Sequence, residues 1–168
     1  KELPLTKDVT FTAGKIKTVN FAYDYVKPSK EVVFDFTNPA AYGITPSEEV
    51  SKGVEIPESV ADGGVTITHV SNSQNKVCIW TKTDNTYEMR AYDSDVITFT
   101  VPEGYVIKKL TLTGEKAPDA AISPNIGSYS SREWTGNANP LVLDIKGTLN
   151  LYTITVEYDL GESDPEKA

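Results

Sequence analysis

One stretch of sequence decides the fold: Asp95-Val96-Ile97-Thr98-Phe99-Thr100-Val101-Pro102-Glu103-Gly104-Tyr105-Val106-Ile107-Lys108-Lys109-Leu110-Thr111-Leu112-Thr113-Gly114. Apolar residues alternate with threonine on both sides of a Pro-Glu-Gly corner. Successive side chains of a strand point to opposite faces, so Ile97, Phe99 and Val101 share one face, and Leu110 and Leu112 repeat the arrangement. The pattern predicts a half-buried antiparallel hairpin.

The same alternation recurs along the chain and predicts about ten strands, at Val9–Phe11, Ile16–Tyr25, Val32–Phe36, Val65–Val70, Val77–Thr83, Tyr87–Tyr92, Val96–Val101, Val106–Thr113, Leu141–Ile145 and Leu149–Tyr158. Clusters of Gly, Pro, Asn, Asp and Ser separate them, as turns require. Helix is almost absent, and only 46–51 has the character of a short helical turn, with Ser47 as its cap. We therefore expect an all-β fold, an antiparallel β-sandwich of jelly-roll type.

The alternation slips by one residue in two of these strands. Leu149 and Leu151 belong to one face, whereas Ile154, Val156 and their alternating neighbours belong to the other if the strand is flat. A β-bulge near Leu151 and Tyr152 restores a single buried face. Ile107 is out of step with Leu110 and Leu112 in the same way, which predicts curved sheets.

At 168 residues the chain is long enough for one domain that buries roughly two thirds of its unfolded surface. We expect the sandwich to occupy residues 32–160. We also expect residues 1–31 to form a strand segment or linker packed on it, and the polar tail 161–168 to fray.

The charge of the chain argues against nucleic acid as a partner. The formal net charge is −8, and only two of the 16 basic residues are arginine, Arg90 and Arg132. Phosphate-backbone binding depends on clustered Lys and Arg, which this composition does not favour. No apolar run has the length of a membrane span.

A wider pattern links Val33-Phe34-Asp35-Phe36-Thr37, the Pro102-Glu103-Gly104 corner, Glu133-Trp134-Thr135-Gly136 and Leu151-Tyr152-Thr153-Ile154-Thr155-Val156. From about Val32 to Tyr158 the chain resembles a group of secreted β-sandwich modules in surface lipoproteins and adhesin-like proteins of Bacteroides-type bacteria. The resemblance implies an extracellular or cell-surface location and a sandwich similar to carbohydrate-binding modules. It carries over no catalytic signature, and membrane attachment would require a lipid anchor on a segment removed before Lys1.

Enzymatic chemistry has little support in the sequence. The single histidine, His69, alternates with Val65 and Ile67 and is expected to be a core or edge residue. No Gly-x-Ser-x-Gly elbow exposes a serine, although the partners of a Ser-His-Asp triad need only meet in space. The lone Cys78 lies in an apolar run and matches no zinc spacing. We expect no catalytic residues.

No cofactor is implied by the sequence, with one alternative. Asp93-Ser94-Asp95 offers hard oxygen ligands in a turn, and Asp93 and Asp95 are therefore candidate ligands of a structural calcium ion. The competing interpretation is that these residues form a tight turn between strands.

Aromatic residues give the best functional lead, because flat rings stack on the apolar faces of sugars while polar groups bind the hydroxyls. Trp134 lies in a polar stretch with Tyr129 and Arg132. If its ring is exposed, these three residues form a ligand site. If it is buried, the ring closes one end of the sandwich.

Trp80 is the centre of a second candidate patch. It alternates with Cys78, and the set of Val77 and Ile79 is the better candidate for the core face. Trp80 then faces outward beside Arg90 or Tyr92 of a neighbouring strand, where a ring and a guanidinium can stack. These residues form either a platform for a glycan or the surface on which residues 1–31 pack, and the sequence leaves both open.

These observations favour a non-enzymatic extracellular module that binds a glycan or another cell-surface ligand. The alternative is a structural or protein-adhesion spacer without a small ligand. The oligomeric state is left open by the sequence.

Overall fold

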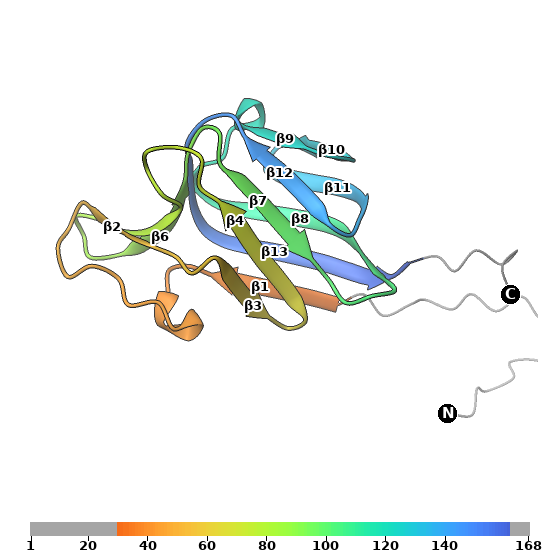
Figure 1. Ribbon diagram of the computed structural model, residues 1–168, viewed down its shortest axis with the longest axis horizontal. Coiled ribbons are helices and arrows are strands. Elements are labelled where there is room, and N and C mark those ends of the chain that lie inside the picture. The colour runs from red at the N-terminus through yellow and green to blue at the C-terminus, as the bar shows by residue number, and fades with distance from the viewer. Residues whose placement is uncertain (1–29, 162–168) are drawn as a thin grey trace, which may run out of the picture.

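The computed structural model describes residues 30–161, which form a sandwich of two antiparallel sheets. Figure 1 shows the smaller sheet in front of the larger one, with β2 and β6 extending beyond it on the left. The expected all-β, jelly-roll-like sandwich is confirmed, with thirteen strands in the described residues where about ten were predicted for the whole chain.

The larger sheet has eight strands: β1 (Lys30–Asp35), β2 (Lys52–Glu55), β5 (Cys78–Thr81), β6 (Tyr87–Ala91), β8 (Tyr105–Lys116), β10 (Ser128–Ser130), β11 (Glu133–Ala138) and β13 (Leu149–Leu160). Its order is β10-β11-β8-β13-β6-β5-β2. β13 is long enough to pair with β8 on one side and with both β6 and β1 on the other. This one strand therefore joins the two halves of the sheet.

The smaller sheet has five strands, in the order β3 (Ser59–Asp62), β4 (Val65–Val70), β7 (Val96–Thr100), β12 (Leu141–Ile145) and β9 (Ile122–Pro124). Two short 3-10 helices, η1 (Pro39–Tyr42) and η2 (Asp119–Ala121), lie in connections. The helical turn expected at 46–51 is wrong: these residues form bends and turns up to Ser51, although the Ser47 hydroxyl accepts a hydrogen bond from the Glu49 amide (3.0 Å).

The Pro102-Glu103-Gly104 corner does not join a hairpin. β7 pairs with β4 and β12 in the small sheet, whereas β8 pairs with β11 and β13 in the large one. The corner is closed by a hydrogen bond from the Tyr105 amide to the Pro102 carbonyl (3.0 Å), and Gly104 adopts a φ of +81°. The two apolar faces therefore meet across the core instead of lying side by side in one sheet.

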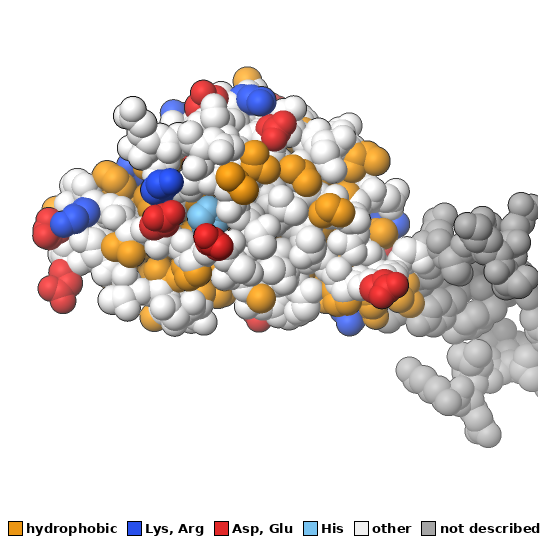
Figure 2. Space-filling view, in the orientation of Figure 1, with side chains coloured by type: hydrophobic (Ala, Val, Ile, Leu, Met, Phe, Trp, Pro, Cys, Tyr) orange, Lys and Arg blue, Asp and Glu red, His pale blue; other side chains and the backbone are white. Residues whose placement is uncertain are grey.

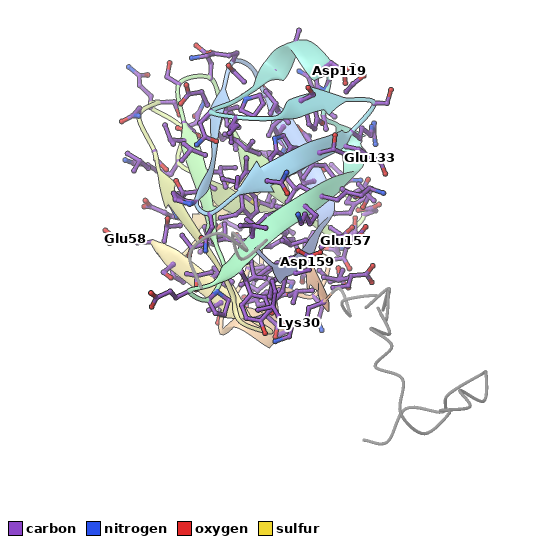
Figure 3. All side chains as sticks on the ribbon, turned by 90° about the vertical axis from the view of Figure 1, so that its right-hand side faces the viewer. Lys30, Glu58, Asp119, Glu133, Glu157 and Asp159 are labelled. Carbon is purple, nitrogen blue, oxygen red and sulfur yellow. The ribbon has the colours of Figure 1, made fainter. Side chains whose placement is uncertain are left out.

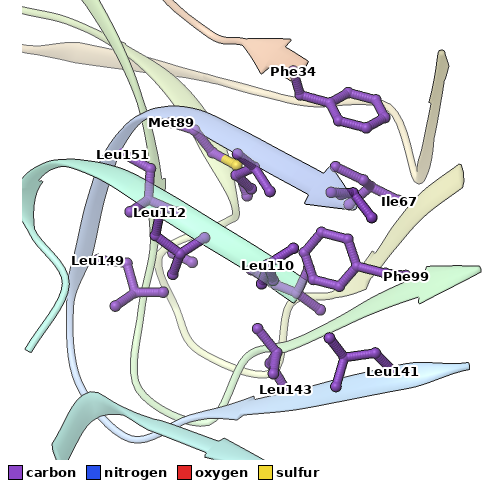
Figure 4. Close-up of a cluster of buried hydrophobic side chains, with 14 of the residues drawn as sticks. Phe34, Ile67, Met89, Phe99, Leu110, Leu112, Leu141, Leu143, Leu149 and Leu151 are labelled. Atoms are coloured by element: carbon purple, nitrogen blue, oxygen red, sulfur yellow. The ribbon is translucent and has the colours of Figure 1, made fainter. Parts of the chain in front are cut away.

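The core lies between the sheets and is built from the alternating residues that the sequence identified (Figure 4). Ile97 and Phe99 of β7 face Leu110 and Leu112 of β8, and all four are at most 2% exposed. At roughly 25 cal/mol for each Å² of apolar surface removed from water, this burial is the main stabilising contribution to the fold.

Both predicted irregularities of strand register are present. Along β13 and β8 the pairing shifts between Leu151 and Thr153, and again between Glu157 and Tyr158. The first bulge keeps Leu151 and Ile154 on the buried face. Gly114 lies at this bulge, where a Cβ atom would come within 2.1 Å of the Asn150 carbonyl oxygen, so the two strands approach too closely for any side chain.

Eight of the predicted strands are found: β4 and β12 have the predicted bounds, and the other six are shifted by one to three residues at one or both ends. The two predicted at 9–11 and 16–25, and the tail from 162, lie outside the described residues. The prediction missed β2, β3, β9, β10 and β11, which have few alternating apolar residues. β1 begins at Lys30 and so spans the expected boundary at residues 31 and 32.

Candidate functional site

Trp134 does not form an exposed stacking surface. Its side chain is fully buried and belongs to the core. The indole N–H donates a hydrogen bond to the Ile126 carbonyl (2.7 Å), and a Cβ atom at either Gly127 or Gly136 would come within 2.6 Å of the ring. The structure therefore agrees with the second interpretation of Trp134, in which the buried ring closes one end of the sandwich. A ligand role for Trp134 does not fit.

Tyr129 and Arg132 support the same corner instead of a ligand. The Tyr129 hydroxyl donates to the Ala117 carbonyl (3.2 Å), and burial raises its pKa to about 12. The Arg132 guanidinium donates to the carbonyl oxygens of Gly114 and Glu115, the latter at 3.3 Å. These bonds fasten β10 and the turn that follows it to the end of β8, so the first predicted patch has no free aromatic face.

Trp80 lies where the alternation placed it. Val77 and Ile79 are fully buried in the core, and Trp80 is partly exposed on the outer face of the large sheet. The guanidinium carbon of Arg90 lies 4.0 Å from the centroid of the ring, which confirms the predicted stack.

A buried carboxylate holds Arg90 in this position. Glu88 is fully buried, and its Oε1 accepts hydrogen bonds from Arg90 Nε (2.7 Å) and from Asn150 Nδ2 (2.9 Å), with Arg90 Nη2 also at 2.7 Å. The second oxygen, Oε2, has no partner within residues 30–161. Sequence reasoning missed Glu88, because only the strand register places it opposite Trp80.

A pocket of about 300 Å³ opens beside the Trp80 ring, and we call it the Trp80 pocket. Gly53 and Glu55 of β2, Lys76 of the 71–77 loop, Cys78, Trp80 and Tyr92 line it. Gly53 pairs with Trp80 across the strands, and a Cβ atom there would lie 2.7 Å from the Cys78 sulfur. The glycine therefore keeps the pocket open at its floor.

The thiol of Cys78 serves the pocket as a polar but uncharged group. Burial raises the pKa of Cys78, although a hydrogen bond with Tyr92 opposes the shift. The thiolate is the nucleophilic form, and a raised pKa keeps the thiol protonated at neutral pH. Burial also raises the pKa of the Tyr92 phenol.

Asp95 positions the loop that forms one wall of the pocket. Its buried carboxylate accepts hydrogen bonds from the amides of Asn72 (3.0 Å), Ser73 (3.3 Å) and Tyr92 (2.8 Å). Asp93, by contrast, is exposed. No group of three or more acidic, histidine or cysteine side chains within residues 30–161 could hold a metal ion. The geometry favours the tight turn over the calcium site for these two residues.

His69 lies near the end of β4, which has β3 and β7 on its two sides, and it is partly exposed with both ring nitrogens engaged. Nε2 lies 3.1 Å from the Pro57 carbonyl oxygen and therefore carries the proton in this contact, and Nδ1 lies 3.4 Å from the Ser71 hydroxyl. That hydroxyl also accepts a hydrogen bond from the Val77 amide (3.0 Å). A serine protease arrangement needs a carboxylate on the far nitrogen, whereas His69 has a backbone carbonyl there.

A further polar group, which the sequence did not indicate, continues the outer face beyond Arg90. The Tyr152 hydroxyl donates to Glu115 (2.7 Å), and Lys82 forms an ion pair with the same carboxylate. Lys82 also lies 5.3 Å from the centroid of the Tyr152 ring. Glu115 belongs to β8, Tyr152 to β13, and Lys82 directly follows β5, so only the pairing of these strands brings the three residues together.

Two further findings concern membrane-spanning segments and similarity to known proteins. In the part of the chain described, no helix is long and apolar enough to span a bilayer. Comparison of the chain with protein-family models, with curated proteins and with solved structures gave no match.

Proposed function

We propose that this chain is a non-enzymatic glycan-binding module whose sugar site is the Trp80 pocket. The observation that carries the proposal is a partly exposed indole, held rigid by Arg90 and Glu88, at the mouth of a polar pocket of about 300 Å³. Pockets of this order and larger accommodate small ligands. A preformed ring also avoids the entropy cost of ordering a mobile side chain on binding.

The groups around the ring suit a saccharide. Glu55, Lys76 and Tyr92 offer carboxylate, ammonium and phenol groups for hydroxyls. The side chains of Glu55 and Lys76 have no ion-pair or hydrogen-bond partner within residues 30–161, so both are available to bind a ligand. Hydrogen bonds to such charged groups are roughly twice as strong as neutral ones.

We extend the proposal to location and partners. The module acts at the cell surface or outside the cell, as the resemblance to surface lipoproteins and adhesin-like proteins implies. Its partner is a glycan, free or carried by a cell-surface protein, and membrane attachment would come only from a lipid anchor.

A structural or adhesive spacer is the second candidate, and one observation favours it. Arg90 already covers one face of the Trp80 ring and leaves its own side chain only 23% exposed. In a spacer this stack serves to shield the buried Glu88 carboxylate from water, and no small ligand binds.

The test is a screen of the purified chain against a panel of mono- to tetrasaccharides that covers the common sugars and linkages. Native protein, Trp80→Ala and Tyr129→Phe are compared after each is shown to be folded. We expect binding by native protein and Tyr129→Phe, and a loss of at least about tenfold in Trp80→Ala, which corresponds to 1.4 kcal/mol. No binding by native protein, or binding that Trp80→Ala leaves unchanged, would overturn the proposal in favour of the spacer.

A further inference from the structure

A second pocket, of about 340 Å³, adjoins the Trp80 pocket, and we call it the His69 pocket. Glu55, Glu58, His69, Val70, Ser71 and Lys76 line it. Glu55 and Lys76 line both pockets, so the two cavities are continuous along these side chains. Figure 2 shows the histidine (pale blue) among acidic and basic side chains on this face of the molecule.

The two shared residues, Glu55 and Lys76, lie where the chain passes from one sheet to the other. Glu55 ends β2 at the edge of the large sheet, and Lys76 belongs to the loop that leads from β4 to β5. The groove therefore runs from the outer face of the large sheet, around its β2 edge, to the end of β4. In Figure 3, Glu58 lies on the opposite side of the sandwich from Glu133 and Glu157, which belong to the other half of the large sheet.

The wall of the His69 pocket is rigid. Asp95 holds the amides of Asn72 and Ser73, and the Asn72 amide group donates to the Ser94 carbonyl (3.0 Å). His69 in turn contacts the carbonyl of Pro57 at 3.1 Å, which fixes the segment between β2 and β3. Both sides of the pocket are thus tied to the sheets by hydrogen bonds.

The side chains that line the pocket include both charged and apolar groups. Neither Glu58 nor Lys76 has an ion-pair or hydrogen-bond partner for its side chain between residues 30 and 161, and Val70 is 57% exposed. An apolar side chain beside unpaired charged groups matches the surface of a sugar ring, which has C–H patches next to hydroxyls. The pocket contains no tryptophan or tyrosine ring, so it adds to binding at the Trp80 pocket without replacing it.

We infer that the Trp80 pocket and the His69 pocket are two subsites of one groove, and that the ligand is a glycan of at least two linked sugar units. This inference rests on the proposed function. The first unit stacks on Trp80, and the next reaches Glu58 and Val70 past Glu55 and Lys76. Trp80 determines whether the chain binds sugar at all, and the His69 pocket determines the length that it prefers.

The experiment measures affinity by calorimetry for the mono-, di-, tri- and tetrasaccharides of the sugar that binds in the screen. The test variant is the double substitution Glu58→Ala with Val70→Ala, because both side chains are exposed and line the His69 pocket but not the Trp80 pocket. The matched control is Glu103→Ala, an exposed acid at the β7–β8 corner, which lies at the far end of β7 from Val96 and its partner Val70. Thermal unfolding checks that all three proteins are folded.

For native protein and for Glu103→Ala we expect an affinity gain of about tenfold from monosaccharide to disaccharide. The double variant should lose that gain and keep the monosaccharide affinity. Equal affinity of native protein for all lengths, or a gain that survives in the double variant, overturns the two-subsite groove while sugar binding through Trp80 stands. If native protein binds no member of the panel, the proposed function fails as well, and the two failures are thereby distinguished.

Discussion

The two tryptophans occupy opposite situations, and in each case the polarity of the neighbouring residues alone would suggest the reverse. Trp134, in a polar stretch rich in Ser, Gly and Asn, is fully buried, whereas Trp80, in an apolar run, is partly exposed. Glycines at positions 127 and 136 let the backbone close over the Trp134 ring. On the outer face of the large sheet, strand alternation alone decides that Trp80 faces outward. Local polarity is therefore a poor guide to the exposure of a large ring.

The largest effect that would sharpen this comparison concerns stability. We expect Trp134→Ala to lower the free energy of unfolding by about 3–5 kcal/mol, because it leaves a large cavity and an unpaired Ile126 carbonyl. Trp80→Ala should cost only about 1 kcal/mol, since its ring is partly in water already and loses mainly the Arg90 stack. Urea denaturation followed by far-UV circular dichroism measures both.

Trp134→Phe serves as the control, because it keeps an aromatic ring in the cavity and should be less destabilising than Trp134→Ala. If Trp134→Ala and Trp80→Ala lower the free energy of unfolding equally, the difference in burial between the two rings does not affect stability, and the comparison fails.

An intermediate effect is expected at the loop beside Trp80. Asp95→Ala removes the acceptor of three backbone amides and should lower the free energy of unfolding by about 2–4 kcal/mol. Asp93→Ala, two residues away and exposed, should change it by less than about 0.5 kcal/mol. Thermal unfolding of both variants, with calcium and with chelator, provides the measurement. If chelator lowers the stability of native protein and either substitution abolishes this effect, the result would support the calcium site instead of the tight turn.

The smallest effect concerns pH and the corner around Trp134. The pKa of Tyr129 is raised to about 12 by burial, above the ordinary value of 10.0, so the unfolded chain loses this proton first as pH rises. The folded state then binds more protons than the unfolded state, and stability falls as pH rises from about 10 towards 12. Tyr129→Phe removes this contribution. Its urea midpoint should fall less between pH values of about 9 and 11 than that of native protein, and an equal fall would contradict the burial of the phenol.

The strands with regular alternation could be predicted from the sequence, because period-2 patterns report directly on a half-buried sheet. β4 and β12 have the predicted bounds, and both bulges follow from the slips at Leu151 and Ile107. The outward direction of Trp80 and its stack on Arg90 followed from the same alternation.

The remaining features depend on long-range pairing, which alternation does not specify. β7 and β8 have the pattern of a hairpin, and nothing local shows that the corner between them crosses to the other sheet. Glu88 and Asp95 are charged residues that a sequence pattern assigns to the surface, yet Arg90 and backbone amides make their burial favourable. The His69 pocket was missed because its residues come from separate segments.

The pairing of β1 with β13 has a mechanical consequence. Lys30 lies opposite Tyr158, so the first and last strands of the described region begin and end side by side in an antiparallel pair. A force that pulls the two ends apart acts on the hydrogen bonds of this pair one rung at a time, from Lys30 towards Asp35, instead of shearing all of them together. Under tension between two attachment points, we expect the sandwich to open by peeling β1 away from β13, while the Trp80 pocket, which neither β1 nor β13 lines, keeps its shape at first.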